Sequence, residues 1–291
     1  MTRARTAGRT IGGIAVAAGI GLAVATAPAT AGPTRAPTAH DTAGLGHIID
    51  VTTQEYHFTM TTMDVAAGLE TVRVRNIGSK DHQFQIFRIN DDATLQQFTS
   101  TLQSGNVGAA LAMVTARGGA TVLAPGHTQI SYTNLPAGQY IALCFVSDAD
   151  GVPHLAKGMA MPFQVEGTTT AKAPKHVSGT FSATMGKRFK APATLISGHT
   201  YAFKNTSMVD IHELDIIKLH PGSTVQKLQH FTGKGELPAT FLGGPGAISP
   251  GLTAWFKLNL KPGKYVILCQ IPDRNGVPHF NEGMYRYITV K

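Results

Sequence analysis

The sequence predicts an all-β protein made of two tandem β-sandwiches, and three observations lead to this fold class. Short segments with alternating apolar and polar residues recur along the chain and are bounded by Gly, Pro and Asn, as is typical of strands. Residues 118–165 and 243–290 share 19 identities in 48 positions, so the chain repeats itself at an offset of 125 residues. A length of 291 residues suits two domains that each bury a core.

The expected elements follow one order in both halves. The strand segments are "TVRVRN", "FQIFRI" and "YIALCFV" in the first half, and "TYAFKN", "LDIIKL", "WFKLNL" and "YVILCQI" in the second. The segments "DDATLQQFTSTLQSG" and "GSTVQKLQHF" instead space their apolar residues three or four positions apart. This spacing predicts one short inserted helix in each half.

The amino terminus predicts an exported protein. Three Arg residues precede an uncharged apolar run, and the sequence Ala29-Thr30-Ala31 then matches a signal-peptide cleavage pattern. No later run approaches the roughly 20 apolar residues of a membrane span, so we expect none in the mature chain; a retained anchor is the alternative. We divide the chain into a signal peptide (1–31), a flexible segment (32–46), domain 1 (47–166), a linker (167–176) and domain 2 (177–291).

Charge is distributed unevenly between the halves. Residues 41–167 carry six Lys and Arg against eleven Asp and Glu, whereas residues 168–291 carry fifteen against six. Two solvated surfaces of different charge explain these numbers most simply; attraction between the domains, or an anionic partner for the second half, is the alternative. We expect no nucleic-acid partner.

The only two cysteines lie at matched positions in the repeat. Cys144 begins "CFVSDADGVPHLAKGM", and Cys269 begins "CQIPDRNGVPHFNEGM". Two cysteines in an exported chain ordinarily indicate a disulfide, but a disulfide does not require a histidine and a methionine at fixed distances after each cysteine. A thiolate, a thioether and two imidazoles form the ligand set of a blue copper site, whereas zinc makes little use of a thioether.

Both halves resemble the cupredoxins, the plastocyanin and azurin group of blue copper domains. The resemblance rests on "VRNIGSKDH" and "FKNTSMVDIH", on the Gly-x-Tyr-x-x-x-Cys segments, and on the His-x4-Met ends. It implies a Greek-key β-sandwich in each half, electron transfer, and a redox partner that docks near His154 and His279. It also implies one copper ion per domain, cycling between Cu(I) and Cu(II), with the ligands His82, Cys144, His154 and Met159 in domain 1 and His212, Cys269, His279 and Met284 in domain 2.

The sequence departs from single-domain cupredoxins at two places. Nine residues separate the cysteine from the following histidine, so this loop must fold back through "DADG" or "DRNG" to bring the histidine to the metal. Gln83 and Glu213 stand where these proteins commonly have Asn. The charge of Glu213 predicts unequal potentials at the two sites.

Three other functions remain open. A two-domain copper oxidoreductase, such as a nitrite reductase or multicopper oxidase, is less favoured because no His-x-His pair occurs, so we expect no enzyme. Copper capture or delivery in the cell envelope is the second, with His57, Met60 and Met63 as an extra Cu(I) site. A metal-free scaffolding module is the third.

Overall fold

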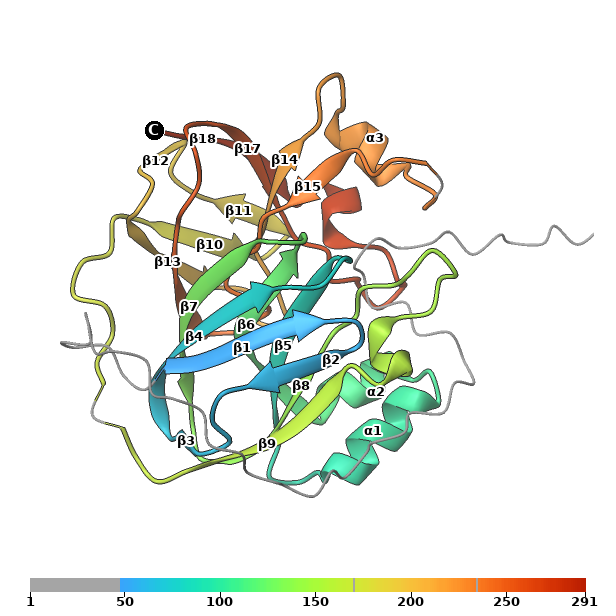
Figure 1. Ribbon diagram of the computed structural model, residues 1–291, viewed down its shortest axis with the longest axis vertical. Coiled ribbons are helices and arrows are strands. Elements are labelled where there is room, and N and C mark those ends of the chain that lie inside the picture. The colour runs from blue at the N-terminus through green and yellow to red at the C-terminus, as the bar shows by residue number, and fades with distance from the viewer. Residues whose placement is uncertain (1–47, 170, 234) are drawn as a thin grey trace, which may run out of the picture.

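The computed structural model describes residues 48–169, 171–233 and 235–291 and shows two β-sandwiches joined side by side (Figure 1). The first half supplies β1 (Ile48–Gln54), β2 (His57–Met60), β3 (Val65–Ala66), β4 (Gly68–Asn76), β5 (His82–Ile89), β6 (Val114–Leu123), β7 (Thr128–Leu135), β8 (Gly138–Leu143) and β9 (Ala160–Glu166). The second half supplies β10 (Thr180–Thr184), β11 (Arg188–Lys190), β12 (Thr194–Leu195), β13 (Thr200–Asn205), β14 (Asp215–Leu219), β15 (Ala239–Phe241), β16 (Thr253–Lys257), β17 (Gly263–Leu268) and β18 (Tyr285–Val290).

Each half is a two-layered sandwich. In the first half, the strands β2-β1-β4-β7 cover the sheet β3-β9-β8-β5-β6. In the second, β11-β10-β13-β16 covers the sheet β12-β18-β17-β14-β15. Alternate residues of both layers point inward, and they form one buried cluster in each half, around Phe84 and Tyr140 in the first and around Phe181 and Phe256 in the second. The predicted fold class is confirmed.

The two halves share one continuous sheet. Strands β7 and β16 pair in antiparallel fashion, with Tyr132 opposite Trp255, so the two covering layers join into an eight-stranded sheet. The other layers also meet, because the N–H of Gly243 donates to the carbonyl of Val122 at 2.9 Å. The Gly-Gly pairs of the repeat lie at this seam. A Cβ at Gly118 would stand 2.9 Å from the carbonyl oxygen of Pro245 in the other half, and the positive φ of Gly118 also favours glycine.

Apolar packing also crosses the seam. Two of the four clusters of buried apolar residues among the described parts of the chain contain residues from both halves. One of them combines Val122, Cys144 and Met159 with Phe241 and Phe280. Each half therefore has a core of its own and a second core that needs the other half. The domain boundaries themselves stay a prediction.

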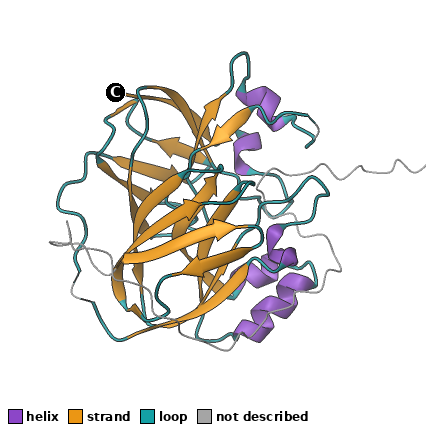
Figure 2. Cartoon of the chain, viewed as in Figure 1, coloured by secondary structure: helices purple, strands orange, loops and turns teal. Residues whose placement is uncertain are grey.

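An inserted helical segment lies in each half, as predicted. Helix α1 (Leu95–Gln103) begins at Thr94, whose hydroxyl accepts from the backbone of Gln97 in a capping box. Helix α3 (Val225–Gln229) begins in the same position of the repeat. The first insert contains a further helix, α2 (Val107–Ala112), which was not predicted because six residues are too few for a periodic pattern. Figure 2 shows the helices along one side of the sandwiches.

The remaining predictions about export concern the amino terminus. The expected signal peptide (1–31) and flexible segment (32–46) lie outside the described residues. Within the residues that the structure describes, none of the helices combines the length and the apolar character needed to cross a membrane.

Candidate metal centres

An asparagine side chain holds the loop ahead of the first histidine in each half. The Nδ2 atom of Asn76 donates to the carbonyl oxygens of Lys80 and Leu123, both at 2.7 Å. Asn205 donates in the same way to the carbonyls of residues 210 and 248, at 2.8 and 2.9 Å. These bonds fix the chain just before His82, which begins β5. They explain why "VRN" and "FKN" stand at matched places in the repeat.

The cysteine-to-methionine loop is also built twice. The N–H of Cys144 donates to the carbonyl of Met159 at 3.2 Å, and that of Met159 donates to the carbonyl of His154 at 3.0 Å. The second half repeats both bonds with Cys269, His279 and Met284, at 3.2 and 2.9 Å. The "DADG" and "DRNG" segments form the expected turns, in which the carbonyl of the first Asp accepts from the Gly N–H. A short 3-10 helix then begins at each histidine: η1 (His154–Lys157) and η2 (His279–Glu282).

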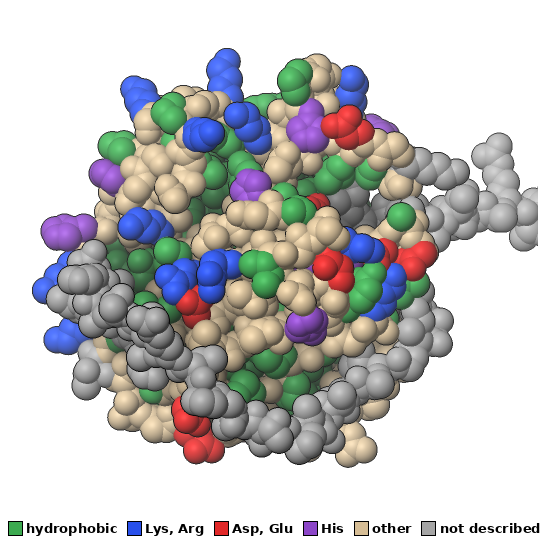
Figure 3. Space-filling model, in the orientation of Figure 1, with side chains coloured by type: hydrophobic (Ala, Val, Ile, Leu, Met, Phe, Trp, Pro, Cys, Tyr) green, Lys and Arg blue, Asp and Glu red, His purple; other side chains and the backbone are tan. Residues whose placement is uncertain are grey.

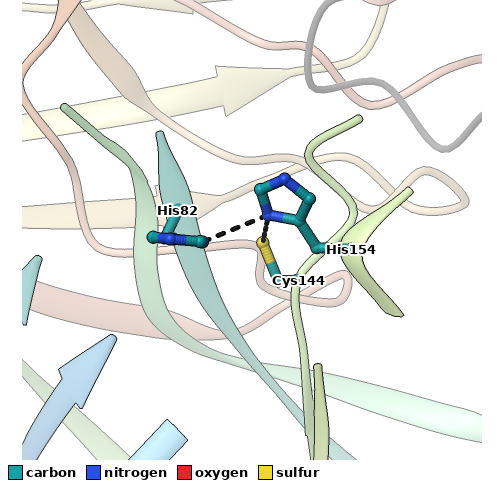
Figure 4. A group of neighbouring side chains, drawn as sticks. All are labelled: His82, Cys144 and His154. Carbon is teal, nitrogen blue, oxygen red and sulfur yellow. Dashed lines mark hydrogen bonds between the residues drawn. The ribbon is translucent and has the colours of Figure 1, made fainter. Parts of the chain in front are cut away.

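Three of the predicted ligands meet in the first half (Figure 4). The Nδ1 atom of His154 lies 3.5 Å from the sulfur of Cys144 and 3.1 Å from Nδ1 of His82. His82 comes from β5, Cys144 from the end of β8, and His154 from the loop before β9. The side chains of all three are at most 1% exposed. The nine-residue loop therefore does bring His154 to the cysteine.

The second half brings the equivalent residues together. The sulfur of Cys269 lies 3.5 Å from Nδ1 of His279 and 3.8 Å from Nδ1 of His212. Both cysteines are free thiols, so the alternative of a disulfide is wrong. Among the residues that the structure describes, these are the two groups of three or more His, Cys, Asp or Glu side chains whose ligand atoms converge.

The predicted methionine ligands lie beside the cysteines. Met159 is fully buried in the same cluster as Cys144, and Met284 is fully buried in the same cluster as Cys269. Gln83 and Glu213 tie the ligand loops together, as Asn does in single-domain cupredoxins. The Oε1 atom of Gln83 accepts from the N–H of Phe145 at 2.7 Å, and Oε1 of Glu213 accepts from the N–H of Gln270 at 3.1 Å.

The electrostatics of both groups fit a soft cation. Burial raises the pKa of the Cys144 thiol to about 12 and lowers the pKa of His82 to about 4. Burial and the neighbouring His279 lower the pKa of His212 to about 3. The imidazoles are therefore neutral, with lone pairs that converge on sulfur, and the Nε2 atoms of His212 and His279 are buried without a hydrogen-bond partner. A thiol and two neutral imidazoles suit copper.

Comparison with known proteins gives the following. No protein-family model and no curated protein matches this chain. Among solved structures, auracyanin A, a "blue" copper protein from Chloroflexus aurantiacus, has 18% identity and a TM-score of 0.29 over 41% of this chain and 98% of its own. A multicopper oxidase has 13% identity and a TM-score of 0.28 over 89% of this chain and 94% of its own. A Cu-containing nitrite reductase from Thermus scotoductus has 11% identity and a TM-score of 0.25, over 84% and 62%.

Each half is a two-layered β-sandwich that holds a His, Cys and His group at one end. This arrangement agrees with the fold and site that the sequence motifs predict.

The two halves differ in the surroundings of the second histidine. Asp148 lies 3.3 Å from Nε2 of His154 and accepts from Lys80 and Lys157, both at 2.6 Å, and from Tyr56 at 2.5 Å. Burial raises the pKa of Asp148, but these hydrogen bonds outweigh burial and hold it well below its usual value. The equivalent Asp273 instead accepts from the backbone of residues 275 and 277, and no carboxylate contact to Nε2 of His279 is present in the described residues.

Glu213 is the second difference between the halves. Burial and the neighbouring Asp215 raise its pKa well above the usual value. The unequal potentials of the two sites stay a prediction. Sequence reasoning assigned Asp148 only to a turn, and its identity with Asp273 gives no sign of the contact with His154, because Asp273 lacks the equivalent contact.

The extra Cu(I) site of the capture alternative is not assembled. The burial of β2 alternates, with His57 exposed and Met60 turned toward the core, so these two side chains lie on opposite faces of the strand. Met63 lies beyond the strand and is 52% exposed.

Proposed function

We propose that this chain is an exported electron carrier with two type 1 copper sites. One observation supports the proposal best: both halves contain a buried group of His, Cys and His, and the same backbone hydrogen bonds hold the ligand loop in each half. A structural role for these side chains would not require both repeats to keep the same donors at the same places.

The residues have distinct roles in this proposal. His82, Cys144 and His154 would hold one copper ion, and His212, Cys269 and His279 the other, with Met159 and Met284 as weak axial ligands. Copper, when bound, supplies a one-electron couple between Cu(I) and Cu(II). The backbone N–H of Gln83 donates to the sulfur of Cys144 at 3.4 Å and so stabilises the thiolate. The buried, bonded loops keep the donors fixed, which limits rearrangement when the charge changes.

We place partner docking near His154 and His279. Each histidine lines a surface hollow: His279 with Val209 and Arg274, and His154 with Lys80 and Phe231. Apolar side chains at or beside the hollow that His279 lines are exposed, Val209 by 66% and Met208 by 79%. On the face in Figure 3, Lys and Arg gather over the strands of the second half, which supports an anionic redox partner there.

Copper loading tests the proposal. Protein given Cu(II) should develop intense absorption near ~600 nm, as expected of a Cu–thiolate centre. Cys144→Ser and Cys269→Ser should each remove about half of the absorption, because each site contributes one thiolate. A copper-loaded protein that stays colourless under oxidising conditions would contradict electron transfer and favour the capture of Cu(I). Turnover of nitrite or oxygen by the copper-loaded protein would instead favour an oxidoreductase.

A further inference from the structure

A chain of buried polar groups connects the two sites. In each half, the residue that follows the first histidine donates its N–H to the cysteine sulfur: Gln83 to Cys144 and Glu213 to Cys269, both at 3.4 Å. These N–H groups donate to the sulfurs themselves. They therefore connect β5 and the segment just before β14 to the two candidate cysteine ligands by hydrogen bonds.

One side-chain hydrogen bond closes the gap between the halves. The Nε2 atom of Gln85 donates to Oε2 of Glu213 at 2.9 Å, and Oε1 of Gln85 accepts from the N–H of Ala247 at 2.8 Å. Gln85 is 2% exposed and Glu213 is 1% exposed. From this bond, the path to the Cys144 sulfur follows the Gln85 side chain, the backbone from Gln85 to Gln83 and the Gln83 N–H hydrogen bond. The connection therefore contains covalent bonds and three hydrogen bonds, all shielded from water.

The hydrogen bond that Glu213 accepts from the N–H of Gln270 does not require a carboxyl group. Gln83 performs the equivalent task in the first half with an amide, because its Oε1 accepts from the N–H that follows the cysteine. A carboxyl group offers a second acceptor oxygen where an amide offers a donor, and Gln85 presents its NH2 at this place. Burying a carboxyl costs free energy that an apolar seam would avoid. Glu213 thus differs from Gln83 in the one atom that reaches the other half.

We infer that the Gln85–Glu213 hydrogen bond couples the two sites for electron transfer within the molecule. This inference rests on the proposed function. One electron leaves the reduced site, Cu(I) becoming Cu(II), and the oxidised site gains it, Cu(II) becoming Cu(I). No proton moves and no covalent bond changes. An electron that enters at one docking face is thereby available at the other.

Three variants test the role of the bond. Gln85→Met keeps the size of the side chain but removes both hydrogen bonds. Gln85→Asn keeps an amide that is too short to reach Glu213. The double variant with Gln85→Glu and Glu213→Gln exchanges donor and acceptor, so that the new Gln donates to the new Glu and the chain is restored. Hydrogen exchange of the Ala247 amide in the metal-free proteins reports whether residue 85 still accepts from it.

The measurement is a pulsed one-electron reduction of the fully oxidised, copper-loaded protein, followed by freeze-quench spectroscopy of the two Cu(II) signals. We expect a first-order redistribution phase that does not depend on protein concentration and that is absent when either cysteine is replaced by Ser. It should slow severalfold in Gln85→Met and Gln85→Asn and recover in the double variant, with both site spectra unchanged. An unchanged rate in Gln85→Met, or no phase in the wild type, overturns the inference while the colour of both sites still supports the proposed function.

Discussion

Asp148 should set the copper affinity of the first site. Its carboxylate contacts Nε2 of His154 at 3.3 Å and holds the ring so that Nδ1 faces the sulfur of Cys144. Partners of this kind orient metal-bound histidines, and their loss weakens metal binding by about 10- to 100-fold, or about 1.4 to 2.7 kcal/mol. We therefore expect Asp148→Leu to weaken Cu(I) binding at this site by that factor. Asp148→Asn keeps an acceptor and should weaken it less.

The assay uses competition with a Cu(I) chelator in a Cys269→Ser background, which leaves the first site alone. Urea unfolding of the metal-free variants is measured alongside, because the lowered pKa of Asp148 means that its carboxylate also stabilises the fold at neutral pH. Asp273→Leu, measured in a Cys144→Ser background, is the matched control, since no bond from Asp273 to His279 is present. An equal loss of affinity in both variants would refute a specific role for Asp148.

Three further predictions concern other parts of the molecule. Burial raises the pKa of Glu70 from 4.5 to about 7, so its stabilising contribution is complete below pH 4.5 and is lost as the pH rises through 7. In urea unfolding, the free energy of unfolding of Glu70→Gln should rise relative to that of the wild type by up to about 3 kcal/mol across that range. The exposed control Glu166→Gln should keep the same difference from the wild type at every pH. Binding of Cu(I) at pH 7 should release about one proton per site, because the buried thiols are protonated and the imidazoles neutral; indicator dye in weak buffer measures it, and no release would contradict the assignment of the cysteines. Fragments 47–166 and 177–291 expressed separately should lack cooperative thermal unfolding by circular dichroism, because each exposes its part of the shared core; mixing them should restore it, and independent cooperative folding would show that the seam is dispensable.

The strands and the metal-site residues were predictable because each leaves a local trace in the sequence. Strand alternation indicates which residues face inward, and the exact repetition of Cys, His and Met spacing separates a ligand set from chance. The histidine on β5 followed from its counterpart in the second half. The family resemblance supplied the assignment of copper, which spacing alone does not give.

The pairing of the two halves and the Gln85–Glu213 hydrogen bond could not be predicted from the local sequence. Gln85 lies in the alternating segment "FQIFRI" and has the pattern of a solvent-facing residue, yet it is buried because the second half covers it. Asp148 and Asp273 are identical in sequence but differ in contacts, since Lys157 accompanies the first and Glu282 stands at the equivalent place in the second. Glu282 pairs with Lys187 instead. Such differences depend on which neighbours the tertiary fold supplies.

The pairing of β7 with β16 also removes a hazard. A lone sandwich would expose both of these strands as open edges, and open edges invite pairing with other chains and aggregation. Joining them leaves β2 and β11 at the two ends of the long sheet. These strands have only four and three residues, and β11 carries exposed Arg188 and Lys190. Short edges, one of them also charged, resist further pairing, so the fused sheet ends where additional chains cannot readily extend it.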